Sequence, residues 1–188
     1  MLNNFLLELV FAVWIFLPAG IANMMPIAMA KLPLLKNWDY PMDFNKTYKG
    51  VRIFGDHKTI RGLISGIIMA IITVYLLQVL YSATPWLQSN LPIDYLKINP
   101  IIFGFLSGFG ALLGDAVESF FKRRTNIKPG ETWFPFDQTD YIIGGLLALA
   151  LYIRFTPLQY VLIIFVYFGL HLATSYLGFL LKLKKSPI

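Results

Sequence analysis

The chain has 188 residues, of which 57% are hydrophobic and only 14% are charged. Several apolar runs are long enough to cross a bilayer, which excludes a soluble domain and predicts an all-α integral membrane protein. The absence of cysteine excludes disulfides and thiolate chemistry, and two histidines without cysteine disfavour a zinc site. The net charge of +6 comes from basic residues in loops beside the apolar runs, where it reports membrane topology more simply than nucleic-acid binding.

Five transmembrane helices are predicted in a single membrane domain, at about residues 5–30, 62–82, 101–121, 139–155 and 158–181. The first contains Pro18 and Pro26, where the helix is expected to kink. Asn23 precedes the second proline, so this stretch is either a kink satisfied by a neighbouring helix or an opened turn that lines a site. The fourth apolar run is short, so it begins within the preceding loop, lies in thinned bilayer or is re-entrant.

The third predicted helix carries both packing and chemical signals. Gly104 and Gly108 form a GxxxG pattern that lets another helix approach closely. A helix that continues to its basic end places four polar side chains on one face, at i, i+3, i+4 and i+7. Ionisable groups at bilayer depth normally face a bundle interior or a water-filled cavity, so this face predicts a functional site. Its members are Asp115, Glu118, Ser119 and Lys122.

The two long polar loops, residues 31–61 and 122–138, are predicted to be cytoplasmic. Together with the tail after Leu181 they hold fourteen basic residues, against two on the other side. This bias puts the N-terminus outside and the C-terminus inside. On the outer side, residues 83–99 read as an interfacial loop with Trp86 and Tyr95 in the aromatic belt.

Two further groups of polar residues lie at the start of one predicted helix and within another. Lys58, Thr59 and Arg61 lie where the second helix starts, and free amides there favour a phosphate; the alternative is that they are ordinary inside-facing charges. In the last helix, one face carries side chains expected to form interhelical hydrogen bonds. These are His171, Thr174 and Ser175.

Carboxylates and bases gather around the second polar loop, at Asp115, Glu118, Asp137 and Asp140 and at Lys122, Arg123, Arg124 and Lys128. Such a set, with neither sulfur nor imidazole, suits hard divalent cations bound through oxygen, with the bases binding phosphate. That is the inventory of phosphoryl or nucleotidyl transfer. The alternative is a surface ion-pair cluster in which an aspartate caps the fourth helix.

Four ordered motifs, NMMP, PMDF, GDHKTIRG and GDAVESFFKRR, resemble those of the CDP-archaeol synthase family of archaea over nearly the whole chain. GDAVESFFKRR followed by DQTD also resembles the signature of the related CDP-diacylglycerol synthases, although Gln138 stands where that signature has arginine. The resemblance implies a Mg²⁺-dependent cytidylyltransferase that uses CTP and an unsaturated archaeal ether-lipid phosphate, and releases CDP-archaeol and pyrophosphate. A lateral opening between helices, beside the kinked first span, would admit the lipid.

The resemblance also implies residue roles at a cytoplasm-facing site. Catalytic roles fall to Lys58, Asp115 and Lys122. Metal binding falls to Asp115, Glu118, Asp137 and Asp140. Substrate binding falls to Asn23, Asp43, Asp56, Thr59, Arg61, Ser119, Arg123 and Arg124.

Two other functions compete with this interpretation. A CDP-diacylglycerol-type synthase would use the same chemistry on another lipid phosphate, and the sequence does not report on tail chemistry. A small ion-coupled transporter would use intramembrane carboxylates as a relay. The transporter is disfavoured because the charges cluster at one membrane face and five spans give no inverted repeat.

Overall fold

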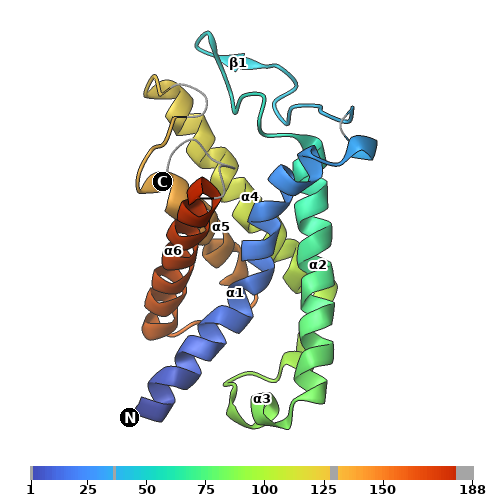
Figure 1. The fold of residues 1–188 in the computed structure, drawn as a ribbon, viewed down its shortest axis with the longest axis vertical. Helices are drawn as coiled ribbons and strands as arrows, with labels where there is room; N and C mark the ends of the chain where they lie inside the picture. The colour runs from blue at the N-terminus through green and yellow to red at the C-terminus, as the bar shows by residue number, and fades with distance from the viewer. Residues whose placement is uncertain (1, 36, 128–130, 181–188) are drawn as a thin grey trace.

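The computed structural model describes residues 2–35, 37–127 and 131–180, which form a bundle of long helices (Figure 1). Within these ranges four helices have the length and apolar composition needed to cross a membrane, as expected for a multi-pass membrane protein. They are α1 (Leu2–Ala30), α2 (Ile60–Ala83), α4 (Pro100–Arg124) and α6 (Pro157–Leu180). Lys128 and the basic tail after Leu181 lie outside the described residues.

The shorter α5 (Phe136–Leu149) differs from the predicted helix at residues 139–155. It begins three residues earlier and ends six residues earlier, and its fourteen residues cover about 21 Å at 1.5 Å each. A tight turn follows, in which the Leu149 carbonyl accepts the amides of Tyr152 and Ile153. The Tyr152 hydroxyl accepts the Asn99 amide at 2.9 Å, which ties this turn to the start of α4. Because this turn is apolar, its sequence does not distinguish it from a continuing helix, which is why the predicted helix ended too late.

The first helix runs unbroken through Pro18 and Pro26. The opened turn considered for residues 23–26 is therefore wrong, and this stretch stays helical. Here α1 packs tightly against α2, because a Cβ on Gly62 would lie 3.0 Å from Pro26 and one on Gly66 would lie 2.9 Å from the Ala22 carbonyl. Glycine lets the two backbones meet, which fixes where Asn23 sits.

The long polar segment between α1 and α2 contains a 3-10 turn, η1 (Pro33–Leu35), and a small hairpin of β1 (Thr47–Tyr48) and β2 (Val51–Arg52). This hairpin and an isolated antiparallel bridge between Pro41 and Thr59 are the departures from an all-α fold among the described residues. Lys49 and Gly50 both have positive φ, 53° and 78°, as a two-residue hairpin turn requires. In Figure 1 the hairpin lies over the upper ends of α4 and α2.

Side-chain caps fix the starts of α2 and α4. Thr59 caps α2 and accepts the Gly62 amide at 3.1 Å. Asn99 caps α4 and accepts two amides, with Pro100 at the first helical position, where its missing N–H costs nothing. These caps fix the helix that carries Asp115 and the loop that carries Lys58.

The other end of the bundle holds α3 (Pro85–Asn90) and η2 (Tyr95–Lys97). Trp86 is exposed there, as an interfacial aromatic should be. The interfacial position predicted for Tyr95 is wrong, because its side chain is fully buried against Trp14 and Phe103. Tyr95 is a core residue that holds the loop against the helices.

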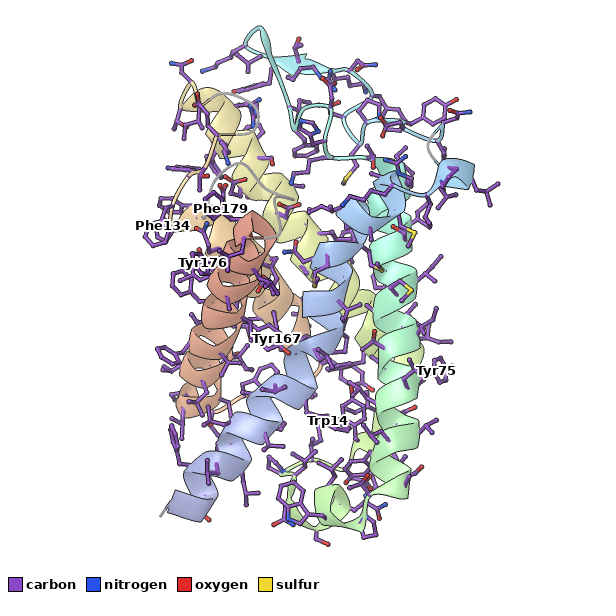
Figure 2. The ribbon with its side chains drawn as sticks, in the orientation of Figure 1. Trp14, Tyr75, Phe134, Tyr167, Tyr176 and Phe179 are labelled. Carbon is purple, nitrogen blue, oxygen red and sulfur yellow. The ribbon has the colours of Figure 1, made fainter. Side chains whose placement is uncertain are left out.

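Aromatic side chains join α1, α5 and α6 in the core. The Phe16 and Tyr167 rings lie 4.9 Å apart, and the Tyr167 hydroxyl donates to the Val13 carbonyl at 2.7 Å. The Tyr141 hydroxyl donates to the Tyr167 carbonyl. Figure 2 shows Tyr167 between α6 and α1, whereas Tyr75 points outward from α2. This core supports the helices beneath the polar end of the bundle.

Candidate active site

The polar face predicted on the third helix is present on α4, which continues to Arg124. Asp115, Glu118, Ser119 and Lys122 all line one polar cavity of about 850 Å³. The cavity lies between α4, α5, α6 and the segment that follows β1. Its charged and imidazole side chains are Arg52, Asp56, His57, Lys58, Asp115, Glu118, Lys122, Arg123, Glu131, Asp137, Asp140 and His171.

Three carboxylates in this cavity converge. One oxygen from each of Asp115, Glu118 and Asp140 lies within 4.8 Å of the others, a spacing that can hold a metal ion. The convergence depends on close contact between α4 and α5, since a Cβ on Gly114 would collide with the Asp140 carbonyl oxygen. One on Gly110 would lie 2.7 Å from the Gly144 carbonyl. The packing role predicted for the α4 glycines is confirmed, with Gly104 and Gly108 meeting α2 in the same way.

The donor set fits a hard divalent cation. All three groups offer carboxylate oxygen, the ligand that Mg²⁺ and Ca²⁺ prefer. Among the described residues, the buried Oε1 of Glu118 has no hydrogen-bond partner. Across the described lining, six carboxylates outnumber four lysines and arginines, so an added cation would favour the binding of a polyanion.

Two lysines compensate part of this negative charge. The Lys58 ammonium lies 2.6 Å from Asp115, and both side chains are about one-fifth exposed. The Lys122 ammonium lies 2.5 Å from Asp137 and 3.8 Å from Glu118, and its side chain is 9% exposed. The predicted catalytic residues Lys58, Asp115 and Lys122 are thus brought together with the carboxylates.

Asp137, predicted as a metal ligand, has a different set of contacts from the converging three. Its Oδ1 accepts from Lys122, and its Oδ2 accepts the Trp133 amide at 2.7 Å. The amide contact fixes the carboxylate at the first turn of α5. This arrangement holds the Lys122 ammonium in the cavity.

The predicted substrate-binding residues divide into three groups. Asp56, Ser119 and Arg123 line the polar cavity. Asn23 and Thr59 line a smaller adjoining cavity of about 310 Å³, which also contacts Lys58 and Asp115. The other three, Asp43, Arg61 and Arg124, are absent from the described lining of both cavities.

Asp43 organises the polar segment. Its side chain is fully buried and accepts from Arg52 and from the amides of Asn45, Phe54 and Gly55. Burial alone would raise the pKa of Asp43, but the hydrogen bonds from Arg52 and the three amides hold that pKa well below its usual range. These bonds shape the turn that presents Lys58.

Arg61 and Arg124 also hold the segment in place. Arg61 donates to the Leu35 carbonyl and pairs with Asp39 at 3.1 Å. Arg124 donates to the carbonyls of Arg52 and Ile53 and lies 3.5 Å from the centre of the Phe120 ring. Arg61 therefore joins the start of α2 to residues 35–39, and Arg124 joins the end of α4 to the hairpin strand β2 and the residue after it.

Some lining residues were not predicted. Gln138 is 2% exposed and lines the polar cavity, and among the described residues its buried Oε1 has no hydrogen-bond partner. Arg52 reaches the cavity from β2 while it pairs with Asp43 and Asp56. The start of α5 at Phe136 would have placed Gln138 on the helix, but nothing in the sequence identified the hairpin that positions Arg52.

The predicted face of α6 is only partly as expected. His171 and Ser175 line the polar cavity. The Thr174 hydroxyl donates to the Leu170 and His171 carbonyls of its own helix, so the interhelical role predicted for Thr174 is wrong.

An apolar cavity of about 730 Å³ adjoins the polar one between α4 and α5. Glu118 and Asp140 line both cavities. Several apolar lining residues, among them Val117 and Leu147, are exposed on the outside of the bundle, so this cavity opens sideways. A lateral opening for lipid beside α1 stays a prediction, and this apolar cavity lies between α4 and α5 instead. Its principal apolar residues are Phe105, Leu106, Phe109, Leu113, Val117, Phe121, Phe136, Ile143, Leu147 and Leu151.

Known proteins match this chain over nearly its whole length. A family model described as CarS-like, CDP-archaeol synthase, matches residues 5–188. The CDP-archaeol synthase of Methanopyrus kandleri is 35% identical, over 96% of this chain and 94% of its own length. That of Pyrococcus furiosus is 33% identical, over 94% and 96%. A solved structure of an intramembrane enzyme for archaeal membrane lipids biosynthesis superposes with a TM-score of 0.68 at 30% identity, over 87% of this chain and 92% of that one.

Proposed function

Since this chain belongs to the CDP-archaeol synthase family, we propose that it transfers CMP from CTP to the phosphate of an unsaturated archaeal ether lipid. The products are CDP-archaeol and pyrophosphate. The observation that carries the proposal is the junction of two unlike cavities. A basic and acidic cavity that suits a nucleotide meets an apolar cavity that suits lipid chains, and Glu118 and Asp140 line both.

The lipid would enter through the lateral opening between α4 and α5. Isoprenoid chains would lie against Phe109, Val117 and Leu147, where apolar contact replaces contact with the bilayer. The phosphate of that lipid would then reach the end of the cavity lined by Glu118 and Asp140. This placement brings the two substrates together without removing the chains from the membrane.

We assign Asp115, Glu118 and Asp140 to hold Mg²⁺, and Asp137 to orient Lys122. When bound, such an ion offsets phosphate charge and orients the transferring group. Support comes from the converging oxygens, from the Oε1 of Glu118, which accepts no hydrogen bond from the described residues, and from the excess of carboxylates in the cavity.

In the reaction, an oxygen of the lipid phosphate attacks the α-phosphorus of CTP. A new P–O–P bond forms while the bond to the β-phosphate breaks, and pyrophosphate leaves in line with the attack. Lys122 and Arg123 lie where they can bind the leaving pyrophosphate, and Lys58 can shift from Asp115 to the α-phosphate. Both phosphates are ionised at neutral pH, so no side chain has to accept a proton.

The active site is proposed to face the cytoplasm, with α5 and the turn after it completing a fifth passage through a thinned bilayer. The bias of basic residues toward the polar end of the bundle supports this orientation. It also gives CTP direct access to the polar cavity.

A purified-protein assay tests the function. CTP, dCTP, ATP and GTP are each offered with ether-linked and ester-linked lipid phosphates in the presence of Mg²⁺. We expect CDP-lipid and pyrophosphate in equal amounts from CTP and the unsaturated ether acceptor. Preference for an ester acceptor would assign the related CDP-diacylglycerol activity, whereas no product with any pair, together with ion flux in liposomes, would favour the transporter.

A further inference from the structure

The first part of the polar segment, residues 31–40, carries an exposed apolar surface, and we call it the anchor segment. None of its described residues lines the three cavities described above. Leu34, in η1, is 92% exposed, the highest value of any large hydrophobic side chain in the described part of the chain. Leu32, Trp38 and Tyr40 are also exposed. An exposed apolar surface marks a contact with another protein or with a membrane.

The anchor segment lies where the helices reach the edge of the bilayer. It follows Ala30, the last residue of α1, and in Figure 1 its short blue turn projects sideways past α2, level with the first turn of that helix. Met24 near the end of α1 and Ile64 near the start of α2 are exposed on the outside of the bundle, where they would contact lipid chains. The anchor segment therefore extends the lipid-facing surface of these helices sideways at the level of the headgroups.

Hydrogen bonds hold the anchor segment in one conformation. Arg61, in the first turn of α2, is 5% exposed, and it donates to the Leu35 carbonyl at 2.8 Å and pairs with Asp39. The Leu35 and Trp38 amides donate to the carbonyls of Leu32 and Leu35, both at 3.1 Å. Backbone groups that are already paired can enter a less polar layer at a smaller cost. The exposed turn is therefore built to keep its apolar side chains outward.

The composition of the anchor segment matches the interface between water and lipid. Interfacial anchors combine leucine and tryptophan with lysine, and aromatic rings are enriched at the level of the headgroups. Leu34 is followed here by Trp38 and Tyr40, and the exposed Lys31 can pair with a lipid phosphate. A second copy of the chain is the other candidate to cover an apolar surface. The net charge of +6 disfavours such self-association and favours a layer of phosphates.

We propose that the anchor segment inserts Leu34 and the neighbouring aromatic rings into the lipid headgroup layer on the polar side of the bundle. This contact goes beyond the proposed reaction and does not depend on it. The anchor segment is also tied to the loop that presents Lys58. The Ile60 amide donates to the Tyr40 carbonyl at 2.9 Å, and the Met42 amide donates to the Lys58 carbonyl at 2.7 Å. The lipid contact therefore supports the loop that carries Lys58 to the polar cavity.

Single-cysteine variants test the insertion, because the native chain contains no cysteine. Leu34→Cys is labelled with an environment-sensitive fluorophore in nanodiscs that hold one protein copy each. Ile72→Cys, at the middle of α2, is the control for the bilayer core, and Thr47→Cys, on β1, is the control for water; both positions are exposed. Lipids that carry a quencher near the headgroup or near the end of the acyl chain report the depth of each label.

We expect the shallow quencher to reduce the fluorescence at position 34 about threefold more than at position 47, because an interfacial segment lies about 5–10 Å into the bilayer. The deep quencher should act mainly at position 72. Equal quenching at positions 34 and 47 would overturn the proposal. A blue-shifted label at position 34 that neither quencher reaches would also overturn it, since protein would then cover this surface.

Hydrogen exchange in unlabelled protein tests the native leucine. Leu34→Asp should raise the exchange rate of the amides of residues 31–40 about tenfold in the same nanodiscs, because a charged side chain withdraws the turn from the headgroup layer. Leu96→Asp, the same substitution at an exposed position at the other end of the bundle, is the control and should leave these amides unchanged. Equal exchange in the two variants would contradict the insertion of Leu34.

Discussion

Replacing Lys122 with methionine removes the ammonium group that lies 2.5 Å from Asp137 and 3.8 Å from Glu118. Methionine keeps the length of the stem, so the change is mainly one of charge. Two carboxylates then face each other without a cation between them. Breaking a buried ion pair costs about 3–5 kcal/mol, and a hydrogen bond to a charged group contributes about 1.5–3 kcal/mol.

The expected loss in free energy of unfolding is near the lower end of these values, at about 2 kcal/mol. Lys122 is 9% exposed, but Asp137 is 23% exposed and both line a cavity large enough to hold water, which screens the charges. For a chain of this size, that corresponds to a fall in Tm of about 4–8 °C. Activity should fall about 10²- to 10³-fold, since a charge that stabilises the leaving phosphate is lost.

Thermal unfolding in detergent and the rate of pyrophosphate release measure the two effects. Lys97→Met is the control, because that side chain is 84% exposed at the other end of the bundle. The double variant with Asp137→Asn should be less destabilised than the sum of its single variants, by about 1–2 kcal/mol. If Lys122→Met matched Lys97→Met in both assays, or if the two single effects simply added, the reasoning about this ion pair would be refuted.

Three further predictions follow from the packing, the apolar cavity and the polar segment. Gly114→Ala should lower the rate about 100-fold, because the added Cβ meets the Asp140 carbonyl oxygen and displaces α5 by about 1 Å. The control Gly169→Ala, at a position with open space, should keep the wild-type rate, and a wild-type rate for Gly114→Ala would contradict the proposed convergence. Val117→Trp should raise the acceptor KM about tenfold by filling the apolar cavity and leave CTP binding intact. The control Val161→Trp, on the exposed side of α6, should change neither quantity, and an equal rise of the acceptor KM in both variants would argue against the lipid cavity. Asp43→Asn should speed proteolysis within residues 31–59 about tenfold at pH 7, because the hydrogen bonds to the carboxylate are weakened. Since the pKa of Asp43 is lowered, the wild-type segment should be equally protected at pH 7 and pH 5 and lose protection only as the pH falls below about 4, and loss of protection at a higher pH would contradict the hydrogen-bond account.

The sequence predicted the long helices and the polar face of α4 because both depend on local spacing. Asp115, Glu118, Ser119 and Lys122 follow helical periodicity, so a continuous α4 places them together. The close approach of α4 to α5 was only partly foreseeable. Glycines indicate that some helix packs closely, but they do not indicate which one.

Other features depend on contacts between residues distant in sequence. Tyr95 has the composition of an interfacial residue, yet the fold buries it against Trp14. The arginine at position 61 resembles a phosphate ligand, yet its guanidinium holds the Leu35 carbonyl and Asp39. An aromatic or a cation has the same local signal in either role, so only the three-dimensional arrangement distinguishes structural residues from those that line the cavities.

The central claim is that Asp115, Glu118 and Asp140 hold a divalent cation at the junction of the nucleotide and lipid cavities. Anomalous diffraction from crystals grown with Mn²⁺ and CTP tests it most directly. We predict a manganese peak bounded by oxygens of these three residues and by the α-phosphate of CTP, and its loss in Asp115→Asn. A peak at the cavity rim beside Asp56 or Glu131 instead, or an unchanged peak in Asp115→Asn, would contradict the account.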